Sequence, residues 1–204
     1  MGLADTLRHA TVDDHRAVEE AELLKSIFRP DFDLDEYALL LGHWACFFCR
    51  FDPELALFHS AKYSYIPRLP RVDRDLAYLS GVTRRPRVRS SYDGWLPRTD
   101  SERLGAIYVL EGSTLGARLI CKRLTERFGS HARLCTAYYA MRTVHWPGFR
   151  AFLDAAESDD TVDPDAVVAG ARSTFGALRD YMDVSACGVL RITATASVGE
   201  PLPV

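Results

Sequence analysis

Two features of this chain could take part in chemistry: a histidine near the N-terminus and a set of glycines near the middle. His15 falls at helical spacing with Leu7, Thr11 and Val18, which places it on the inward face of a helix. A neutral imidazole on an apolar wall is a common axial ligand of heme iron. A buried histidine that hydrogen-bonds a backbone carbonyl gives the same pattern, and spacing alone favours this second interpretation.

The glycines lie in the helix-like segment "SERLGAIYVLEGSTLGARLI". Gly105, Gly112 and Gly116 are separated by seven and four residues, so they fall close to one helical face. Each interior glycine costs a helix about 0.5–1 kcal/mol relative to alanine, so the set needs a reason. A close helix crossing, a kink or a flat ligand against bare backbone would each supply one. From the sequence alone, helix packing and ligand contact are equally good explanations of these glycines.

Other chemistry-bearing residues give weaker signals. Arg8 precedes His15 by about two helical turns on nearly the same side, so it could reach an anionic group of a shared ligand, although a solvated arginine is the commoner case. None of the six histidines forms an H-x-x-x-H or E-x-x-H pair, so no multi-histidine metal site is expected. Cys46 and Cys49 fall within a helical pattern among aromatic residues, which favours buried packing over redox chemistry.

The periodicity is helical along nearly the whole chain, and no run alternates as a strand would. Thr99 and Glu102 form a capping box for the longest helix, and Pro53 should kink or split an earlier one. The expected helices cover residues 3–24, 36–59, a short segment ending at 81, 99–129, 131–139, 147–156 and 164–182. The sequence therefore predicts one all-α domain at 1–183 and an irregular tail at 184–204.

The bulk composition is that of a soluble globular protein. The 204 residues carry a net charge of −3, which provides no basic field for nucleic acid. No run approaches the roughly 18 apolar residues of a spanning helix, and the N-terminus lacks the apolar stretch of a signal peptide. Five irregularly spaced cysteines favour reduced thiols. We therefore expect a cytoplasmic protein that binds neither nucleic acid nor membrane.

Four stretches together resemble one known family, over roughly residues 6 to 182. "LRHATVDDHRAVEE" follows the pattern L-x-x-A-T-x-x-x-H-x-x-x-E of the first helix of haem (heme) oxygenases. "YVLEGSTLGARLI" is similar to the distal helix of the bacterial branch often paired with bacteriophytochromes, and "IPRLPRVDRDLAYLSG" and "STFGALRDYM" resemble further segments of that branch. The resemblance implies a single-domain helical bundle with heme between a proximal and a distal helix.

The resemblance also implies roles for single residues. His15 would be the proximal axial ligand of the heme iron. Gly112 and Gly116 would lie against the other face of the porphyrin, where their bare backbone would steer bound oxygen. Ser113 stands at the position of a distal aspartate in the animal enzymes, as is normal in the bacterial branch. Gly112, Ser113 and Gly116 are therefore the catalytic candidates.

Contacts with the heme propionates are carried over in the same way. Arg8 matches a basic position that makes such a contact, and Arg150 and Arg142 are further candidates. The chain departs from the family pattern in two places. The usual G-G-Q of the distal helix ends here in Ala117 and Arg118, and the Y-G-x-x-T-G-x-x-W segment is reduced to "YAMRTVHW". These departures bear on heme orientation and the position of ring cleavage more than on heme binding.

The implied activity is cleavage of heme b with O2 to biliverdin, carbon monoxide and ferrous iron. Heme is then both substrate and cofactor. The sequence has no flavin or iron–sulfur signature, so an external electron donor, a ferredoxin or a flavoprotein reductase, is implied. A bacteriophytochrome could take up the biliverdin. The alternatives are a heme carrier or sensor, a thiaminase-like non-heme enzyme of the same fold, and an interaction protein.

Overall fold

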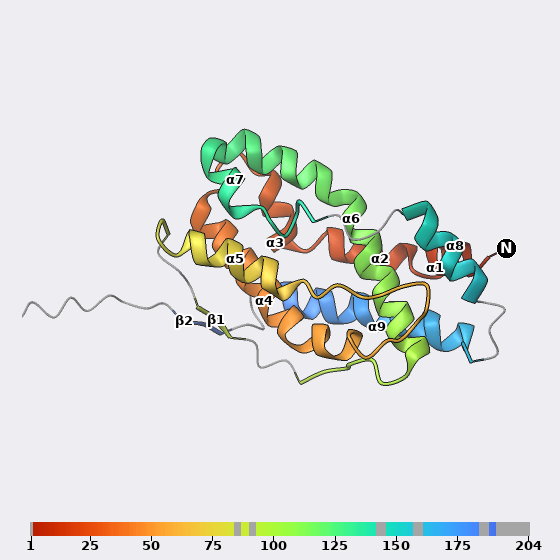
Figure 1. Cartoon of the computed structure of the whole chain (residues 1–204). Helices are drawn as coiled ribbons and strands as arrows, with labels where there is room; N and C mark the ends of the chain where they lie inside the picture. Colours follow the sequence, from red (N-terminus) through yellow and green to blue (C-terminus); the bar gives the residue numbers. More distant parts are fainter. Residues whose placement is uncertain are drawn as a thin grey trace, which may run out of the picture.

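Helices are the main secondary structure of the described chain (Figure 1). The computed structural model describes residues 2–83, 87–89, 93–141, 146–156, 161–183 and 188–190. The elements in chain order are α1 (Leu3–Ala10), α2 (Val12–Glu19), α3 (Glu22–Lys25), η1 (Ser26–Phe28), α4 (Leu34–Leu55), α5 (Leu69–Leu79), β1 (Arg87–Arg89), α6 (Asp100–Phe128), η2 (Gly129–His131), α7 (Ala132–Cys135), α8 (Trp146–Ala156), α9 (Pro164–Met182) and β2 (Gly188–Leu190). The prediction of an all-α fold is confirmed.

The two longest helices begin and end at the capping signals in the sequence. Thr99 accepts a hydrogen bond from the backbone N–H of Glu102, whose carboxylate accepts one from the backbone of Thr99. α6 stops at Gly129, which has a φ of 56° that favours glycine. Asp33 and Glu36 form the same reciprocal cap at the start of α4. Local hydrogen bonding therefore defines the helices that frame the core.

The predicted first helix is split at Thr11. The backbone there leaves helical geometry, with φ −115° and ψ 9°, and the Thr11 hydroxyl donates to the carbonyl of Leu7 at 2.8 Å. Thr174 makes the same bond to Gly170 within the unbroken α9, so the split lies in the backbone dihedral angles of Thr11 itself. Two helices, α1 and α2, therefore replace the single helix that the periodicity predicts.

Other boundaries differ less. α4 is not split at Pro53 and continues to Leu55. The helix predicted at 131–139 is shorter, because only α7 and the preceding η2 form there. α8 and α9 match their predicted bounds to within one residue. The periodicity therefore predicts where the helices lie more accurately than where they end.

One short strand pair was not predicted. β1 and β2 pair antiparallel, with Arg87 opposite Leu190 and Arg89 opposite Gly188. β1 lies between the predicted helices that end at 81 and begin at 99, and β2 lies within the tail predicted to be irregular. The other residues of 184–204 lie outside the described part of the chain. The division into a domain and a tail therefore stays a prediction.

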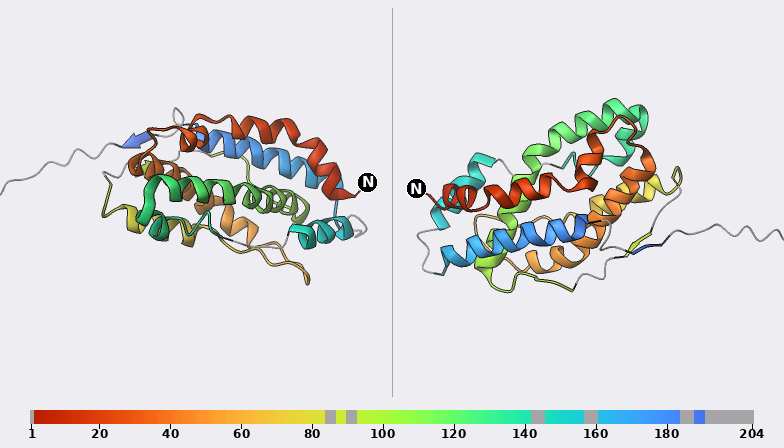
Figure 2. Two further views of the ribbon diagram at one scale, coloured as in Figure 1. Left: turned by 90° about the horizontal axis from the view of Figure 1, so that it is seen from above. Right: turned by 180° about the vertical axis from the view of Figure 1, so that it is seen from behind.

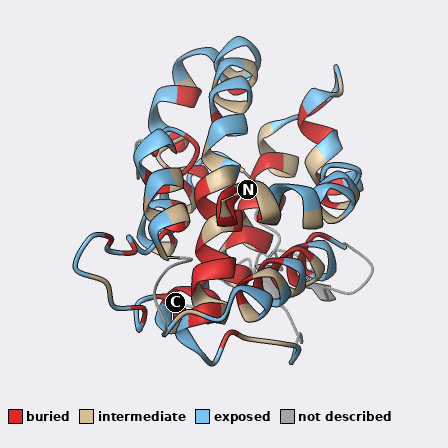
Figure 3. Ribbon diagram, turned by 90° about the vertical axis from the view of Figure 1, so that its right-hand side faces the viewer, coloured by how far each residue is buried: buried red, intermediate tan, exposed pale blue. Residues whose placement is uncertain are grey.

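The helices pack around α6 and α9. Both views in Figure 2 show α2 alongside α9, and α4 packs against both α6 and α9. Figure 3 shows the buried residues gathered on the inward faces of the helices. The centre is aromatic, and α4 contributes most of it through fully buried Tyr37, Phe47, Phe48 and Phe51. The core therefore lies between α4, α6 and α9.

α6 and α9 cross in close contact. A Cβ built on Gly105 would lie 2.1 Å from the carbonyl oxygen of Val167, and one on Gly170 would lie 2.5 Å from that of Glu102. Only residues without a side chain allow two backbones to approach this closely. Helix packing therefore explains Gly105.

One stretch of the described chain, Asp100–Cys135, could cross a membrane by length and composition alone. In the structure, 44% of its most apolar window is buried, and α6 packs against α9 inside the protein. A core helix of a soluble protein passes the same test, so this feature is weak evidence for a membrane span.

A buried histidine bonded to a backbone carbonyl does occur, but at His43. Its Nδ1 hydrogen-bonds the carbonyl oxygen of Tyr181 at 2.6 Å, and its Nε2 lacks a partner among the described residues. Burial lowers the pKa of His43, because a buried imidazolium would lose its hydration. We conclude that His43 is neutral at pH 7 and donates through Nδ1.

This burial predicts a pH dependence of stability. The unfolded chain binds a proton near the ordinary histidine pKa of 6.5, whereas folded His43 does so only at lower pH. The stabilisation is therefore fully present above pH 6.5 and is lost as the pH falls, by up to about 1.4 kcal/mol per pH unit. Urea unfolding should show a steeper loss for wild type than for His43→Gln. Equal slopes would contradict this assignment.

The helix crossing predicts opposite effects for two glycine substitutions. Gly105→Ala should lower the free energy of unfolding by about 3 kcal/mol or more, because its Cβ meets backbone that cannot move aside. Gly176→Ala, on α9, should raise it by about 0.5–1 kcal/mol, since nothing lies within 4 Å of that Cβ. Urea unfolding at neutral pH measures both. A Gly105→Ala variant as stable as wild type would show that the crossing is looser than described.

Candidate functional site

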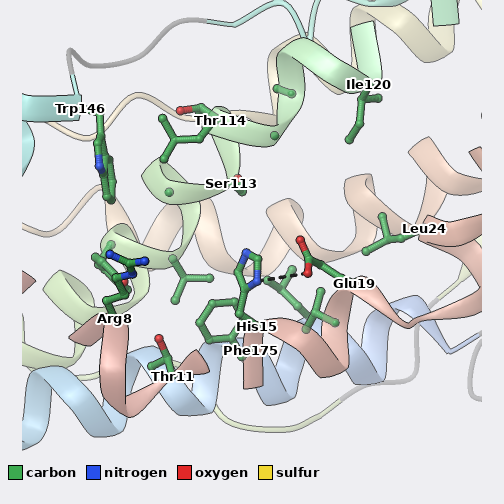
Figure 4. Close-up of a pocket in the computed structure, with 18 of the residues that line it drawn as sticks. Arg8, Thr11, His15, Glu19, Leu24, Ser113, Thr114, Ile120, Trp146 and Phe175 are labelled. Atoms are coloured by element: carbon green, nitrogen blue, oxygen red, sulfur yellow. Dashed lines mark ion pairs between the residues drawn. The ribbon is translucent and has the colours of Figure 1, made fainter. Parts of the chain in front are cut away.

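A cavity of about 640 Å³ lies between α6 on one side and α1, α2 and α9 on the other (Figure 4). Its walls are largely apolar and aromatic. Segments far apart in the sequence meet there, since His15 comes from α2, Gly112 and Gly116 from α6, and Phe175 from α9. The cavity therefore brings together the histidine and the glycine pair that the sequence singles out.

His15 faces this cavity and not the packed core. Its side chain is 55% exposed, whereas Leu7, Thr11 and Val18 of the same predicted stripe are buried. The prediction of an inward, core-facing histidine is wrong in this respect, because the break at Thr11 interrupts the stripe. Figure 4 shows the imidazole rising from α2 toward α6. The ring therefore forms part of the cavity wall.

Two contacts hold the His15 ring. Its Nδ1 lies 3.5 Å from a carboxylate oxygen of Glu19, one helical turn further on. The ring of Phe175 packs edge-on against it, with ring centroids 5.8 Å apart. A carboxylate at one ring nitrogen fixes the tautomer and orientation of an imidazole that coordinates through the other nitrogen. The arrangement therefore directs Nε2 of His15 into the cavity.

The opposite wall is bare backbone. A Cβ on Gly116 would have no atom within 4 Å, and one on Gly112 would meet only the ring of Trp146 at 3.7 Å. Neither glycine is needed for packing, in contrast to Gly105. The face of three glycines thus divides into one packing position and two positions that leave open space in front of the helix.

Two hydroxyl groups lie beside the glycines. Ser113 donates to the carbonyl of Leu110 at 2.7 Å, and Thr114 donates to the carbonyl of Glu111 at 2.6 Å. Both protons are therefore engaged within α6 itself. In this arrangement the two side chains can accept a hydrogen bond from a ligand or water, but they do not donate one.

Basic side chains gather at the α1 end of the cavity. Arg8 and Arg150 both line it, and Arg150 donates to a carboxylate oxygen of Asp5 at 2.8 Å. Tyr108 lies beside them. Burial raises its pKa, while a hydrogen bond with Thr11 and the charges of the two arginines oppose that rise. This end can therefore receive an anionic group.

Arg142, the third basic candidate, lies outside the described residues. Tyr108 was not predicted, although it begins the segment "YVLEG" and lines the cavity together with the glycines. Its spacing of four residues before Gly112 could have shown this. The described site thus contains two of the three predicted basic residues and one aromatic hydroxyl that was not predicted.

The two departures from the family pattern differ in their effect on the cavity. Ala117 lines it and is 8% exposed, so its methyl group takes up space there. Arg118 is exposed and is not among the lining residues, so its charge lies away from the cavity. Tyr139, Met141 and Trp146 of the altered "YAMRTVHW" segment also line the cavity, and residues 142–145 fall outside the described chain.

A group of inner-wall residues was not predicted. The buried guanidinium of Arg68, 1% exposed, lines the cavity together with Trp44, Tyr138 and Tyr139. Arg68 belongs to the "RLP" segment used for the resemblance, but its spacing gives no sign that it reaches a helix-lined pocket. Its position depends on long-range packing.

Other candidate sites find little support. Cys46 and Cys49 lie within α4 as expected, but Cys49 is exposed, so the prediction of a buried pair is wrong for it. Among the described residues, no three histidine, cysteine or carboxylate side chains come together as metal ligands. The cavity is therefore the site on which a functional assignment rests.

These features define a class of protein: a helical bundle with a largely apolar pocket, an imidazole on one wall and arginine side chains at one end. The model of the heme oxygenase family, described as "Heme oxygenase", matches residues 1–184. The chain therefore belongs to the heme oxygenase family, whose activity is the oxidative degradation of heme.

Solved structures share the fold. A heme oxygenase from Leptospira interrogans is 17% identical, with a TM-score of 0.68, over 89% of this chain and 98% of that one. The NO- and CO-bound heme oxygenase from Neisseria meningitidis is 20% identical, with a TM-score of 0.63, over 89% of this chain and 90% of that one. No curated protein matches the chain. The expected all-helical, heme oxygenase-like bundle is thus confirmed.

The open space before Gly116 predicts that folding and ligand binding respond oppositely to one methyl group. Gly116→Ala should stabilise the ligand-free protein by about 0.5–1 kcal/mol, because alanine favours the helix. The same methyl group should weaken heme binding about tenfold, the size of a modest overpacking cost. Urea unfolding and heme titration measure the two effects.

Gly176→Ala is the matched control, because Gly176 is also open on a helix but does not line the cavity. It should share the gain in stability and leave heme affinity unchanged. If Gly116→Ala also leaves the affinity unchanged, the glycine wall does not contact heme.

Proposed function

We propose that this chain opens the ring of heme b to form biliverdin, with release of carbon monoxide and ferrous iron, and that His15 is the proximal ligand of the iron. The observation that carries the proposal is the placement of His15 and Gly116 on opposite walls of one cavity of about 640 Å³. An imidazole on one side and bare backbone on the other suit a flat ring that is ligated on a single face.

The residues present fit heme at three points. Glu19 orients His15 so that Nε2 is the free ligand nitrogen. Gly116 and Gly112 leave room for a porphyrin face. Arg8 and Arg150 supply positive charge at one end, where two propionates would be held. Each point comes from a different part of the fold. The pocket would therefore discriminate between ligands by both their shape and their charge.

Bound heme would supply the redox chemistry, with O2 as the oxidant. The residues of the chain would determine where that chemistry takes place. As the iron ligand, the His15 imidazole would donate less electron density than a thiolate would. Gly112 and Gly116 limit the space on the other face. Ser113 lies beside them and can accept a hydrogen bond from water.

The electrons would come from a separate protein, a ferredoxin or a flavoprotein reductase. This part of the proposal is supported by the sequence, which contains no flavin or iron–sulfur signature. A bacteriophytochrome is the proposed consumer of biliverdin, on the resemblance of "YVLEGSTLG" to the branch often paired with such proteins. A cytoplasmic location suits both the reduced cysteines and these partners.

Heme titration of His15→Ala tests the ligand assignment. The wild-type protein should give a Soret band typical of imidazole ligation, and the variant should lose that spectrum and form no biliverdin with reductant and O2. His9→Ala is the control, because His9 is exposed on α1 and bonds only the carbonyl of Asp5 in the described structure. Added imidazole should restore the wild-type spectrum to His15→Ala.

Two outcomes would contradict the proposal in different ways. If His15→Ala keeps the wild-type spectrum and affinity, another residue ligates the iron. If wild type binds heme but yields no biliverdin with reductant and O2, the chain is a heme carrier or sensor of this fold.

A further inference from the structure

A buried polar cluster adjoins the inner wall of the cavity. Its centre is Arg68, in the connection between α4 and α5. One oxygen of Asp52 accepts the backbone N–H groups of Arg68 at 2.8 Å and Leu69 at 2.7 Å, and its other oxygen accepts the Tyr65 hydroxyl at 2.7 Å. Asp52 therefore fixes the backbone from which the Arg68 side chain extends.

The guanidinium of Arg68 is held from α6. Its Nη2 donates to Oε1 of Glu111 at 3.2 Å, and the Tyr63 hydroxyl donates to the same oxygen at 2.8 Å. Both charged side chains are almost completely buried, at 1% and 0% exposed. Arginine remains charged in proteins. A positive charge is therefore fixed beside the α6 wall of the cavity.

Arg68 has donor capacity that the protein does not use. Its Nε has no hydrogen-bond partner among the described residues, although the side chain lines the cavity. Tyr138 lies beside it; burial raises the pKa of Tyr138, and the charge and hydrogen bond of Arg68 oppose that rise. A buried arginine with an unused donor at a cavity wall indicates a group that acts on the cavity contents.

The α6 wall of the cavity offers few hydrogen-bond donors. The hydroxyl protons of Ser113 and Thr114 bond carbonyls of α6, and the other α6 residues that line the cavity beyond Tyr108 are glycine or apolar. Tyr108 is engaged at the α1 end with Thr11. Any negative charge that develops on the α6 side of a bound ligand therefore needs a donor from another element.

We propose that Arg68, held in place by Glu111, is the hydrogen-bond donor and fixed positive charge of the inner pocket, and that it stabilises oxygen-borne negative charge on the α6 side of bound heme, directly or through an ordered water. This inference rests on the proposed function. Preorganised donors act most strongly in buried, water-poor sites. Glu111 is then a positioning residue, which holds the guanidinium and moderates its field.

The test uses carbon monoxide bound to ferrous heme in the full chain as a probe of the local electric field. A positive charge near the carbon monoxide oxygen favours electron donation from iron into the ligand and lowers the C–O stretching frequency. Arg68→Met should therefore raise the frequency, and Glu111→Gln, which keeps the acceptor but removes the negative charge, should lower it. Arg68→Lys should restore part of the wild-type shift. Infrared or resonance Raman spectra measure the frequency.

Arg103→Met is the control for loss of an arginine ion pair. Arg103 is 13% exposed and pairs with Glu54 and Asp100 away from the cavity, so its loss should leave the frequency unchanged. If Arg68→Met does not fold because buried Glu111 loses its counter-charge, the double variant Arg68→Met/Glu111→Gln replaces it and should also raise the frequency.

The outcomes separate this inference from the function on which it rests. Absence of heme binding by wild type would overturn both. Heme binding with one unchanged frequency in every variant would overturn the role of Arg68 alone. Shifts of Arg68→Met and Glu111→Gln in the same direction would also overturn it, because they would indicate a general loosening of the pocket and not a local field.

Discussion

The close crossing of α6 and α9 is the constraint on which the site depends. Gly105 and Gly170 let the two backbones touch, which sets the separation and angle of the helices at one end. Gly112 lies seven residues further along α6, about 10 Å at the rise of an α-helix. A fixed crossing at Gly105 therefore sets where Gly112 and Gly116 stand relative to the opposite wall, and the same residue type performs two different tasks along one helix.

The opposite wall depends on a local break in the backbone. α1 ends at Thr11, where φ and ψ leave helical values, and α2 begins at Val12. Without that break, His15 would continue the buried stripe of Leu7 and Thr11. With it, the imidazole faces open space, where Glu19 and Phe175 hold it. The site thus combines one very regular helix with one interrupted helix.

Much of this could be predicted from the sequence, for physical reasons that differ from element to element. Capping boxes and a helix-ending glycine act over a few residues, so the ends of α6 and the start of α4 were readable. His15 and the glycine pair were found because their types are unusual at those positions. The break at Thr11 was missed, because the apolar period continues across it.

Arg68 was missed because its place is set by Asp52 and Glu111 on other elements, and no local pattern encodes that. The division of the glycines into packing and open positions likewise requires the partner helix to be in place. In both cases the role of the residue depends on contacts with distant parts of the chain, which only the tertiary structure shows.

The two walls of the cavity differ in how firmly they are anchored. α6 has 29 residues and is fixed by the crossing, whereas α2 has eight residues and buries only Val18. Helices this short have little stability of their own, so α2 holds its shape mainly through contact with α9. Amide hydrogens of α2 should exchange with solvent sooner than those in the first half of α6. A wide, rigid ligand would then displace the short α2 more easily than the crossing of α6 with α9 at Gly105.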